Sequence, residues 1–100
     1  MDPVRPEFQI SDLVITTAGR DQGDLFYCVG TRGSRVLLVN GKDRTLEKPK
    51  RKSPRHVRKV LRSETRVAEK LRQGDKVLNS ELRRDLAFLA REMQSNDLGG

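Results

Sequence analysis

The sequence SDLVITTAGRDQGDLFYCVGTRGSRVLLVNG, residues 11–41, contains the clearest fold signals of this chain. It holds three short runs of β-branched and other apolar residues, separated by segments rich in glycine and polar residues. Such runs predict short strands, and the separators predict turns. We therefore expect strands at 13–17, 25–29 and 35–39.

The Asn-Gly pair at 40–41 is a strong hairpin signal, because both residues tolerate a positive φ. It predicts a turn into a fourth strand at 44–47. A basic loop should follow at 48–55, since its two prolines disfavour helix and keep the chain extended. A last strand is expected at 56–61. The fold class is then mainly β, a small barrel of about five antiparallel strands over residues 10–62.

Beyond residue 62 the apolar period changes from that of strands to that of helices. Ser63 is expected to cap a first helix, which runs to Gln73 and stops at Gly74. Asn79 or Ser80 should cap a second helix. Its apolar stripe consists of Leu82, Leu86, Leu89 and Met93. We expect the stripe to pack on the barrel, because a lone helix of this length is marginal; a helix that binds a protein partner is the alternative.

The predicted domain organisation is one folded core with a flexible segment at each end of the chain. Residues 1–9 are expected to form a flexible leader, since prolines interrupt them. Residues 63–94 form the helical appendage, and residues 95–100 a frayed tail.

The positive charge of the chain is concentrated in one segment. The net charge is +7 overall, but it is −1 over residues 1–41, +8 over residues 42–62 and zero over residues 63–100. A focused basic segment raises the local potential and favours a polyanionic partner.

Residues 11–41 resemble the KOW motif, through Asp12-Leu13-Val14-Ile15, the Gly19 to Gly23 loop, Tyr27 with Val29, and the run from Val36 to Gly41. The Lys48-Pro49-Lys50-Arg51-Lys52 segment and His56 strengthen the resemblance. The chain is similar to bacterial KOW-domain RNA-binding proteins, which are related to a large-subunit ribosomal protein family of archaea and eukaryotes. The resemblance implies an SH3-like barrel that contacts RNA, usually ribosomal RNA, through its loops.

Candidate RNA-binding side chains are basic residues of the loops and of the +8 segment. They are Arg20, Lys42, Arg44, Lys48, Lys50, Arg51, Lys52, Arg55, His56, Arg58 and Lys59, with Arg62 at the end of the segment. Guanidinium and ammonium groups suit phosphate oxygens. Gly19, Gly23 and Gly41 are expected to shape the loops that present them. The simpler interpretation is that these residues form a solvated basic surface without a specific partner. Asp21 is expected to form an ion pair with Arg20 or to cap backbone amides.

Phe26 and Tyr27 are adjacent on a predicted strand and therefore face opposite sides. We expect one in the core and the other exposed, where it either stacks on a base or simply packs. Cys28 is expected to be a small buried apolar group.

Catalysis and metal binding are not expected. One histidine and one cysteine cannot supply the four ligands of the usual zinc site, and phosphate-binding glycine motifs are absent from the sequence. No cofactor and no small-molecule substrate is expected, because so small an apolar core leaves little room for a deep cavity.

Other signals favour a soluble cytoplasmic protein. No apolar run approaches the roughly 20 residues of a membrane span, a signal-peptide pattern is missing, and a single cysteine excludes an internal disulfide. The leading hypothesis is a ribosome-associated RNA-binding protein. The rivals are a protein-interaction adaptor that uses the barrel, and a DNA-binding protein.

Overall fold

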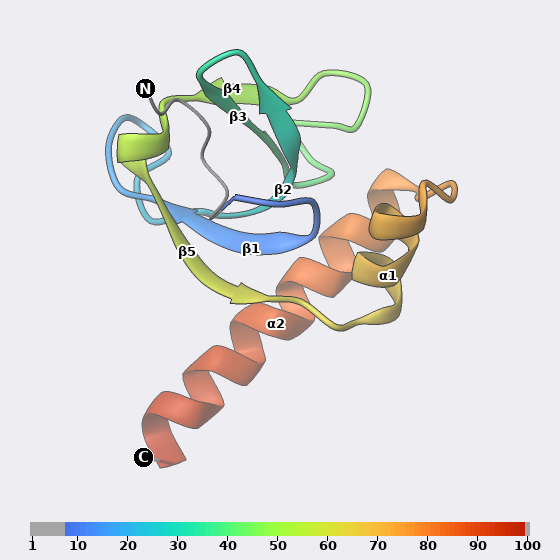
Figure 1. The fold of residues 1–100 in the computed structure, drawn as a ribbon. Helices are drawn as coiled ribbons and strands as arrows, with labels where there is room; N and C mark the ends of the chain where they lie inside the picture. Colours follow the sequence, from blue (N-terminus) through green and yellow to red (C-terminus); the bar gives the residue numbers. More distant parts are fainter. Residues whose placement is uncertain (1–7, 100) are drawn as a thin grey trace.

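The computed structural model describes residues 8–99, with side chains as far as residue 94. Its five strands, in chain order, are β1 Asp12–Thr16, β2 Leu25–Arg32, β3 Arg35–Val39, β4 Lys50–Lys52 and β5 Val57–Arg62. A 3₁₀ helix, η1 Pro54–His56, joins the last two strands, and the helices α1 Arg66–Gln73 and α2 Asn79–Gly99 follow. The prediction of a mainly β fold with two C-terminal helices is confirmed (Figure 1).

The five strands form one antiparallel sheet in the order β4-β3-β2-β1-β5. A flat sheet would hold its two edge strands about 19 Å apart. The link from β4 to β5 consists of Ser53 and η1, and it spans about 15 Å at most. The sheet must therefore curl, and Figure 1 shows the strands wrapped around a common interior. Pairing between β4 and β5 is absent among the described strands, so the barrel stays open along that edge.

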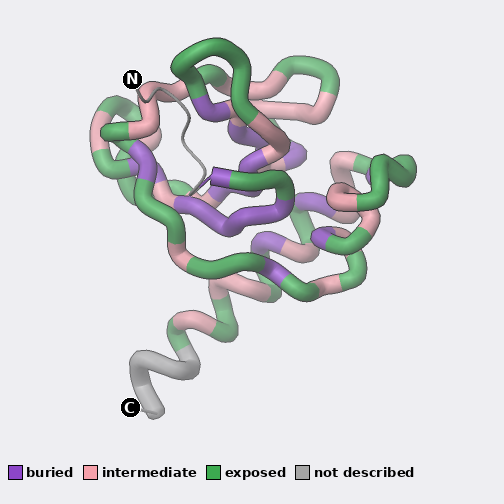
Figure 2. Tube along the Cα trace, in the orientation of Figure 1, coloured by how far each residue is buried: buried purple, intermediate pink, exposed green. Residues whose placement is uncertain are grey.

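Each side of the curled sheet carries its own apolar cluster. The inner cluster draws on four strands and on Phe8; its members are Phe8, Val14, Phe26, Cys28, Val36, Leu38 and Val57. The outer cluster joins the strands to the helices; its members are Leu13, Tyr27, Val39, Ala68, Val77, Leu82 and Leu86. Figure 2 shows buried segments on the strands and on the parts of the helices nearest to them. Alternation along β1, β2 and β3 thus serves two cores, because the helices cover this part of the outer face.

The expectation that Phe26 or Tyr27 is exposed is wrong. Both are buried, with exposed fractions of 2% and 0%. Phe26 points into the barrel and Tyr27 points into the layer between the sheet and the helices, so opposite faces of the strand both lead to a core. Stacking of Tyr27 on a base is thereby excluded. Cys28 is buried, as expected, and burial raises the pKa of its thiol to about 11.

The apolar stripe of α2 packs on the barrel, which confirms the expectation for this helix. Leu82 and Leu86 are buried in the outer cluster, while Leu89 and Met93 are half-buried against it. A helix that binds a protein partner would need an exposed apolar stripe, and these four side chains already contact the outer cluster. Among the described helices, none is both long enough and apolar enough to cross a membrane.

The first helix is capped by Thr65 and not by Ser63. The Thr65 hydroxyl accepts from the backbone N–H of Ala68 at 3.1 Å. The Ser63 hydroxyl instead lies 2.8 Å from the hydroxyl of Tyr27, which makes it part of a buried contact. The predicted stop at Gly74 is confirmed, since Gly74 is the C-cap of α1.

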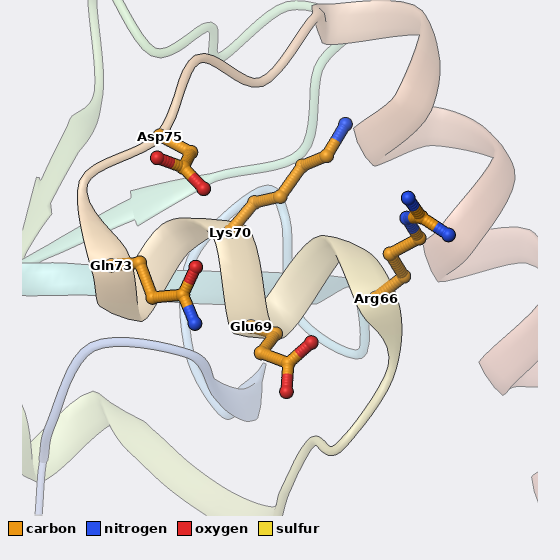
Figure 3. Close-up of a pocket in the computed structure, with 5 residues that line it drawn as sticks. All are labelled: Arg66, Glu69, Lys70, Gln73 and Asp75. Atoms are coloured by element: carbon orange, nitrogen blue, oxygen red, sulfur yellow. The ribbon is translucent and has the colours of Figure 1, made fainter.

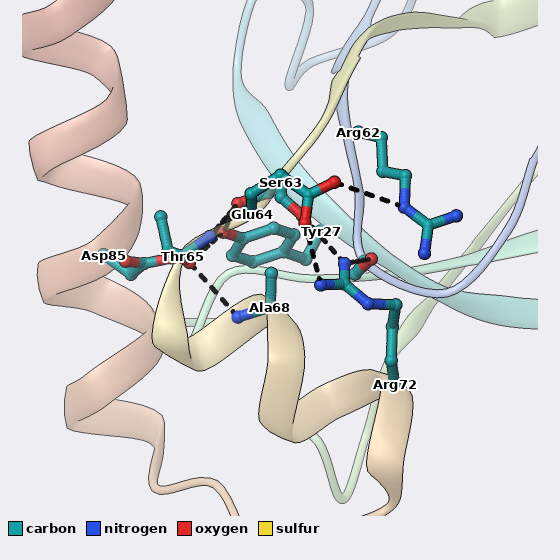
Figure 4. A network of polar contacts seen from close by, with 9 residues as sticks. Tyr27, Arg62, Ser63, Glu64, Thr65, Ala68, Arg72 and Asp85 are labelled. Atoms are coloured by element: carbon teal, nitrogen blue, oxygen red, sulfur yellow. Dashed lines mark hydrogen bonds and ion pairs between the residues drawn. The ribbon is translucent and has the colours of Figure 1, made fainter.

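A partly buried polar network around Tyr27 joins the sheet to both helices (Figure 4). Tyr27 donates its hydroxyl to the carboxylate of Asp85 on α2, and Thr65 donates to the same oxygen at 2.7 Å. Arg72 donates to the Ser11 hydroxyl at 2.7 Å and to the Ser63 carbonyl at 2.8 Å. These contacts orient the helices against the sheet, because each buried polar group requires its particular partner.

We expect the single tyrosine to report directly on this network. Burial, together with the hydrogen bond to Asp85, raises the pKa of Tyr27 to about 12, although the Ser63 and Thr65 hydroxyls act in the opposite direction. The raised pKa stabilises the folded protein by about 3 kcal/mol at pH values below 10, the pKa of the unfolded state. This stabilisation is lost as the pH rises through the folded pKa of about 12. Absorbance at the tyrosinate band should titrate near pH 12 in the folded protein and near 10 in denaturant. A native midpoint near 10 would contradict the network.

The predicted fourth strand at 44–47 is wrong. The turn after β3 does form, and the backbone N–H groups of Asn40 and Gly41 both donate to the carbonyl of Arg44. The chain then makes a second turn, because Leu46 packs against the outer cluster and its N–H donates to the side chain of Asn79 on α2. Pairing with β3 resumes only at Lys50, so β4 lies inside the segment that was expected to be a basic loop.

The two ends of the chain are more ordered than expected where they are described. Residues 1–7 of the expected leader lie outside the described residues, but Phe8 is buried in the inner cluster. The expected frayed tail continues α2 as far as Gly99, because no proline stops the helix after Met93; Gly100 lies outside the described residues.

Candidate nucleic-acid interface

An open groove of about 410 Å³ lies along β4 and η1, beside the start of β3. We call it the basic groove. Its lining residues are Arg35, Lys50, Arg51, Lys52, Ser53, Arg55 and His56. Five of these seven carry a permanent positive charge, and none is acidic. The groove is therefore a site of concentrated positive potential on the described surface.

The side chains of β4 divide between the two sides of the strand. Arg51 pairs in register with Leu37 and is exposed. Lys50 and Lys52 pair with Leu38 and Val36, which belong to the inner cluster. Cross-strand neighbours share a face, so both lysines start from the inner side of the sheet. Inward charges on an edge strand also discourage pairing with another chain.

Asp21 holds both of these lysines from the loop between β1 and β2. Lys52 donates to Asp21 Oδ1 at 2.9 Å and to the carbonyl of Ala18 at 2.8 Å, and its side chain is only 12% exposed. Lys50 lies 3.5 Å from Asp21 Oδ2, an oxygen that makes no hydrogen bond. Lys52 is thus a structural residue, whereas Lys50 is held by charge alone and also lines the groove.

The expected partner of Asp21 was Arg20 or a backbone amide. A backbone hydrogen bond does form at Asp21, but its ion pairs are with Lys50 and Lys52 in place of Arg20. The error arises because the lysines lie about thirty residues further along the chain, and only curling of the sheet brings them to the loop. Burial alone would raise the pKa of Asp21. The Lys52 hydrogen bond and the charges of both lysines outweigh that effect and hold the pKa below its usual value.

We expect Asp21→Asn to weaken the fold and strengthen binding of polyanions. The substitution removes one partner of two ion pairs, so the free energy of unfolding should fall by about 1–2 kcal/mol at neutral pH. Because the folded pKa is depressed, this contribution is present above the unfolded pKa and disappears as the pH falls through the folded one. Urea unfolding of both proteins at neutral and acid pH measures it.

The same variant frees Lys50 and Lys52 for an external anion. The affinity for RNA should rise, with a steeper salt dependence. Asp24→Asn is the matched control, because Asp24 lies in the same loop and is exposed. Equal behaviour of the two variants would show that Asp21 does not restrain the lysines.

Gly19 and Gly23 bracket this loop as predicted, and both have a positive φ, of +95° and +91°. A Cβ atom on Gly19 would lie 2.9 Å from Lys52 Nζ. Gly19 therefore leaves room for the lysine that reaches Asp21, in addition to shaping the turn.

Arg20 and Arg44 lie apart from the groove, in a neighbouring hollow that is balanced in charge. This hollow is lined by Arg20, Asp21, Asp24, Phe26, Asp43, Arg44 and Lys50. Its three carboxylates match its three cations. A polyanion would meet repulsion there as well as attraction, so these two arginines are weaker candidates than those of the groove.

The other predicted cations are spread over the surface. Lys42 and Lys48 are exposed in the 41–48 loop and line neither hollow. Arg58 is exposed on β5, whereas Lys59 lies 3.5 Å from the buried carboxylate of Asp12. Arg62 forms an ion pair with Glu64 at 3.7 Å. The structure thus gathers only part of the predicted set into one site.

A further hollow, on α1, shows what a balanced site looks like in this protein (Figure 3). Arg66, Glu69, Lys70, Gln73 and Asp75 line it, and Lys70 donates to Glu81 at 3.0 Å. Two cations face two carboxylates, so this hollow offers no net attraction for an anion.

Arg35 is the one charged residue of the groove that the sequence analysis did not predict; Ser53 is the other lining residue outside the predicted set. Arg35 lies outside the +8 segment, at the beginning of β3. The antiparallel pairing of β3 with β4 aligns Val36 with Lys52, which brings Arg35 beside the end of β4. The signal was available, because a strand that returns from the 40–41 turn must end beside the start of the strand before it.

No protein-family model matches this chain, and no curated protein matches its sequence. The resemblance of residues 11–41 to the KOW motif therefore stays an expectation from the sequence. The side chains that line the groove, and those that neutralise them, carry the functional argument.

Proposed function

We propose that this chain is an RNA-binding protein that associates with the ribosome through the basic groove. The observation that carries the proposal is the lining of that groove, in which five permanent cations are opposed only by the single carboxylate of Asp21 behind Lys50 and Lys52. RNA is a polyanion of the kind such a lining attracts, and the resemblance to KOW proteins favours ribosomal RNA.

The exposed members of the groove would supply the phosphate contacts. Arg35, Arg51 and Arg55 are exposed, and each guanidinium can donate two parallel hydrogen bonds to a phosphate. The exposed imidazole of His56 lies among them and can donate a further bond. Lys50 would exchange Asp21 for phosphate. Binding then releases condensed counterions, so it should weaken as salt rises.

The test is equilibrium binding of the purified chain to ribosomal RNA over a range of salt concentrations. We expect the logarithm of the binding constant to fall linearly with that of salt, with a slope of about 2 to 4 for three or four phosphate contacts. Salt-independent binding contradicts the proposal. So does tighter binding to duplex DNA of matched length.

Co-purification with ribosomes provides the second measurement. The association should disappear when RNA is digested with nuclease. A protein partner that survives the digestion would instead favour an adaptor role for the barrel.

A further inference from the structure

The positions of the aromatic residues constrain what kind of RNA the groove can take. The chain has three phenylalanines, one tyrosine and no tryptophan. Phe8, Phe26 and Tyr27 are buried, with exposed fractions of 8%, 2% and 0%. Phe88 is exposed, but it lies on α2 and is not among the residues that line the groove.

Proteins that bind single strands rely on exposed aromatic rings as stacking platforms for unpaired bases. The basic groove has no phenylalanine or tyrosine ring, and its only flat groups are the arginine guanidinium groups and the small imidazole of His56, all of which can donate hydrogen bonds to phosphates instead. Its chemistry is directed at phosphates, which every base-paired helix presents on its outside.

The backbone beneath the three exposed arginines of the groove is fixed, because each of them belongs to a regular element. Arg35 begins β3, Arg51 lies at the centre of β4, and Arg55 lies within η1, whose first residue is Pro54. Pro54 fixes its own φ and so restricts the backbone next to Arg55. Cations anchored on a fixed backbone suit the regular phosphate spacing of a helix best, since a flexible strand must lose conformational entropy to match them.

We propose that the groove binds a base-paired helical segment of RNA through its phosphates and stacks on no base. This inference rests on the proposed RNA-binding function and adds the class of RNA. Recognition is then by helical shape and backbone charge, with little preference for sequence.

The test measures binding to three fluorescently labelled RNAs of equal length by anisotropy. The first is a hairpin with a fully paired stem, the second a strand that cannot pair, and the third an abasic ribose-phosphate chain. We expect the hairpin to bind about tenfold more tightly than the strand. The strand and the abasic chain should bind equally, because the groove does not stack on bases.

Each other outcome has a definite meaning. A strand that binds as tightly as the hairpin, or an abasic chain that binds about tenfold more weakly than the strand, overturns the inference and leaves RNA binding intact. Failure to bind any of the three overturns the proposed function itself. Phe88→Ala should bind all three RNAs as the unaltered protein does; a selective loss on the strand would show stacking on α2 and overturn the inference.

Discussion

Charge reversal at Arg35, Arg51 and Arg55 together is expected to lower the affinity for RNA by roughly 100-fold or more. The three side chains are exposed and belong to the basic groove, so the substitution to glutamate turns its strongest anion contacts into repulsion. The log–log salt slope should fall by about 2 to 3, which is 0.7 to 0.9 for each lost phosphate contact. Filter binding at several salt concentrations measures both quantities.

A matched control separates local from overall charge. The variant Arg66→Glu, Arg84→Glu, Arg91→Glu changes the net charge equally, at three exposed positions on α1 and α2. We expect it to retain most of the affinity and nearly the full slope. If both triple variants weaken binding alike, the net charge of the protein does the binding and the groove has no special role.

Lys52 is an unsuitable position for charge reversal. The sequence makes it an obvious target, since it lies within the +8 segment. Its ammonium group is bonded to Asp21 and to the carbonyl of Ala18, so its loss would also disturb the loop between β1 and β2. A variant of Lys52 would mix a folding defect with a binding defect.

Gly41→Ala is expected to produce the largest loss of stability, about 3–5 kcal/mol. Gly41 has a φ of +76°, which costs energy for any residue with a side chain. A Cβ atom there would lie 2.4 Å from the carbonyl oxygen of Asn79 and 2.9 Å from Leu82 Cβ. The first turn of α2 packs directly on this glycine, and Arg83 donates to its carbonyl at 2.7 Å. The added methyl group must push the helix away.

Gly23→Ala is the control for this prediction. Its φ is +91°, but a Cβ atom there would meet no heavy atom within 4 Å. The variant should lose only about 1–2 kcal/mol of stability, which is the cost of the backbone strain. Thermal and urea unfolding followed by circular dichroism give both values. Equal losses would mean that α2 does not approach the 40–41 turn as described.

Local patterns were sufficient for most secondary structure. The apolar runs at 13–17, 25–29 and 35–39 correspond to β1, β2 and β3, and Gly74 ends α1 as predicted. These signals work because turn residues and strand or helix periods act over a few neighbouring residues. The prediction of a strand at 44–47 was wrong, because Leu46 packs against the outer cluster and donates its N–H to Asn79 of α2. The next strand therefore begins only at Lys50.

The sequence predicted which segment is basic, but not how its side chains are arranged in space. Charge counts along the chain located the segment that contains β4 and η1. They did not show that Asp21 neutralises part of it, that Asp12 lies against Lys59, or that Arg35 joins it from another strand. Each of these contacts joins residues more than fifteen positions apart, so no local pattern encodes them.

Local patterns in the chain were enough to predict the fold class, the positions of most strands and helices, and the excess of positive charge between residues 42 and 62. The burial of Tyr27, the structural role of Lys52 and the gathering of Arg35, Arg51 and Arg55 in one groove are evident only in the folded protein. The two groups of properties differ in the distance along the chain over which the responsible interactions act. Backbone preferences and apolar periodicity act between neighbours, whereas burial and ion pairing depend on which distant segments the curled sheet and α2 bring together.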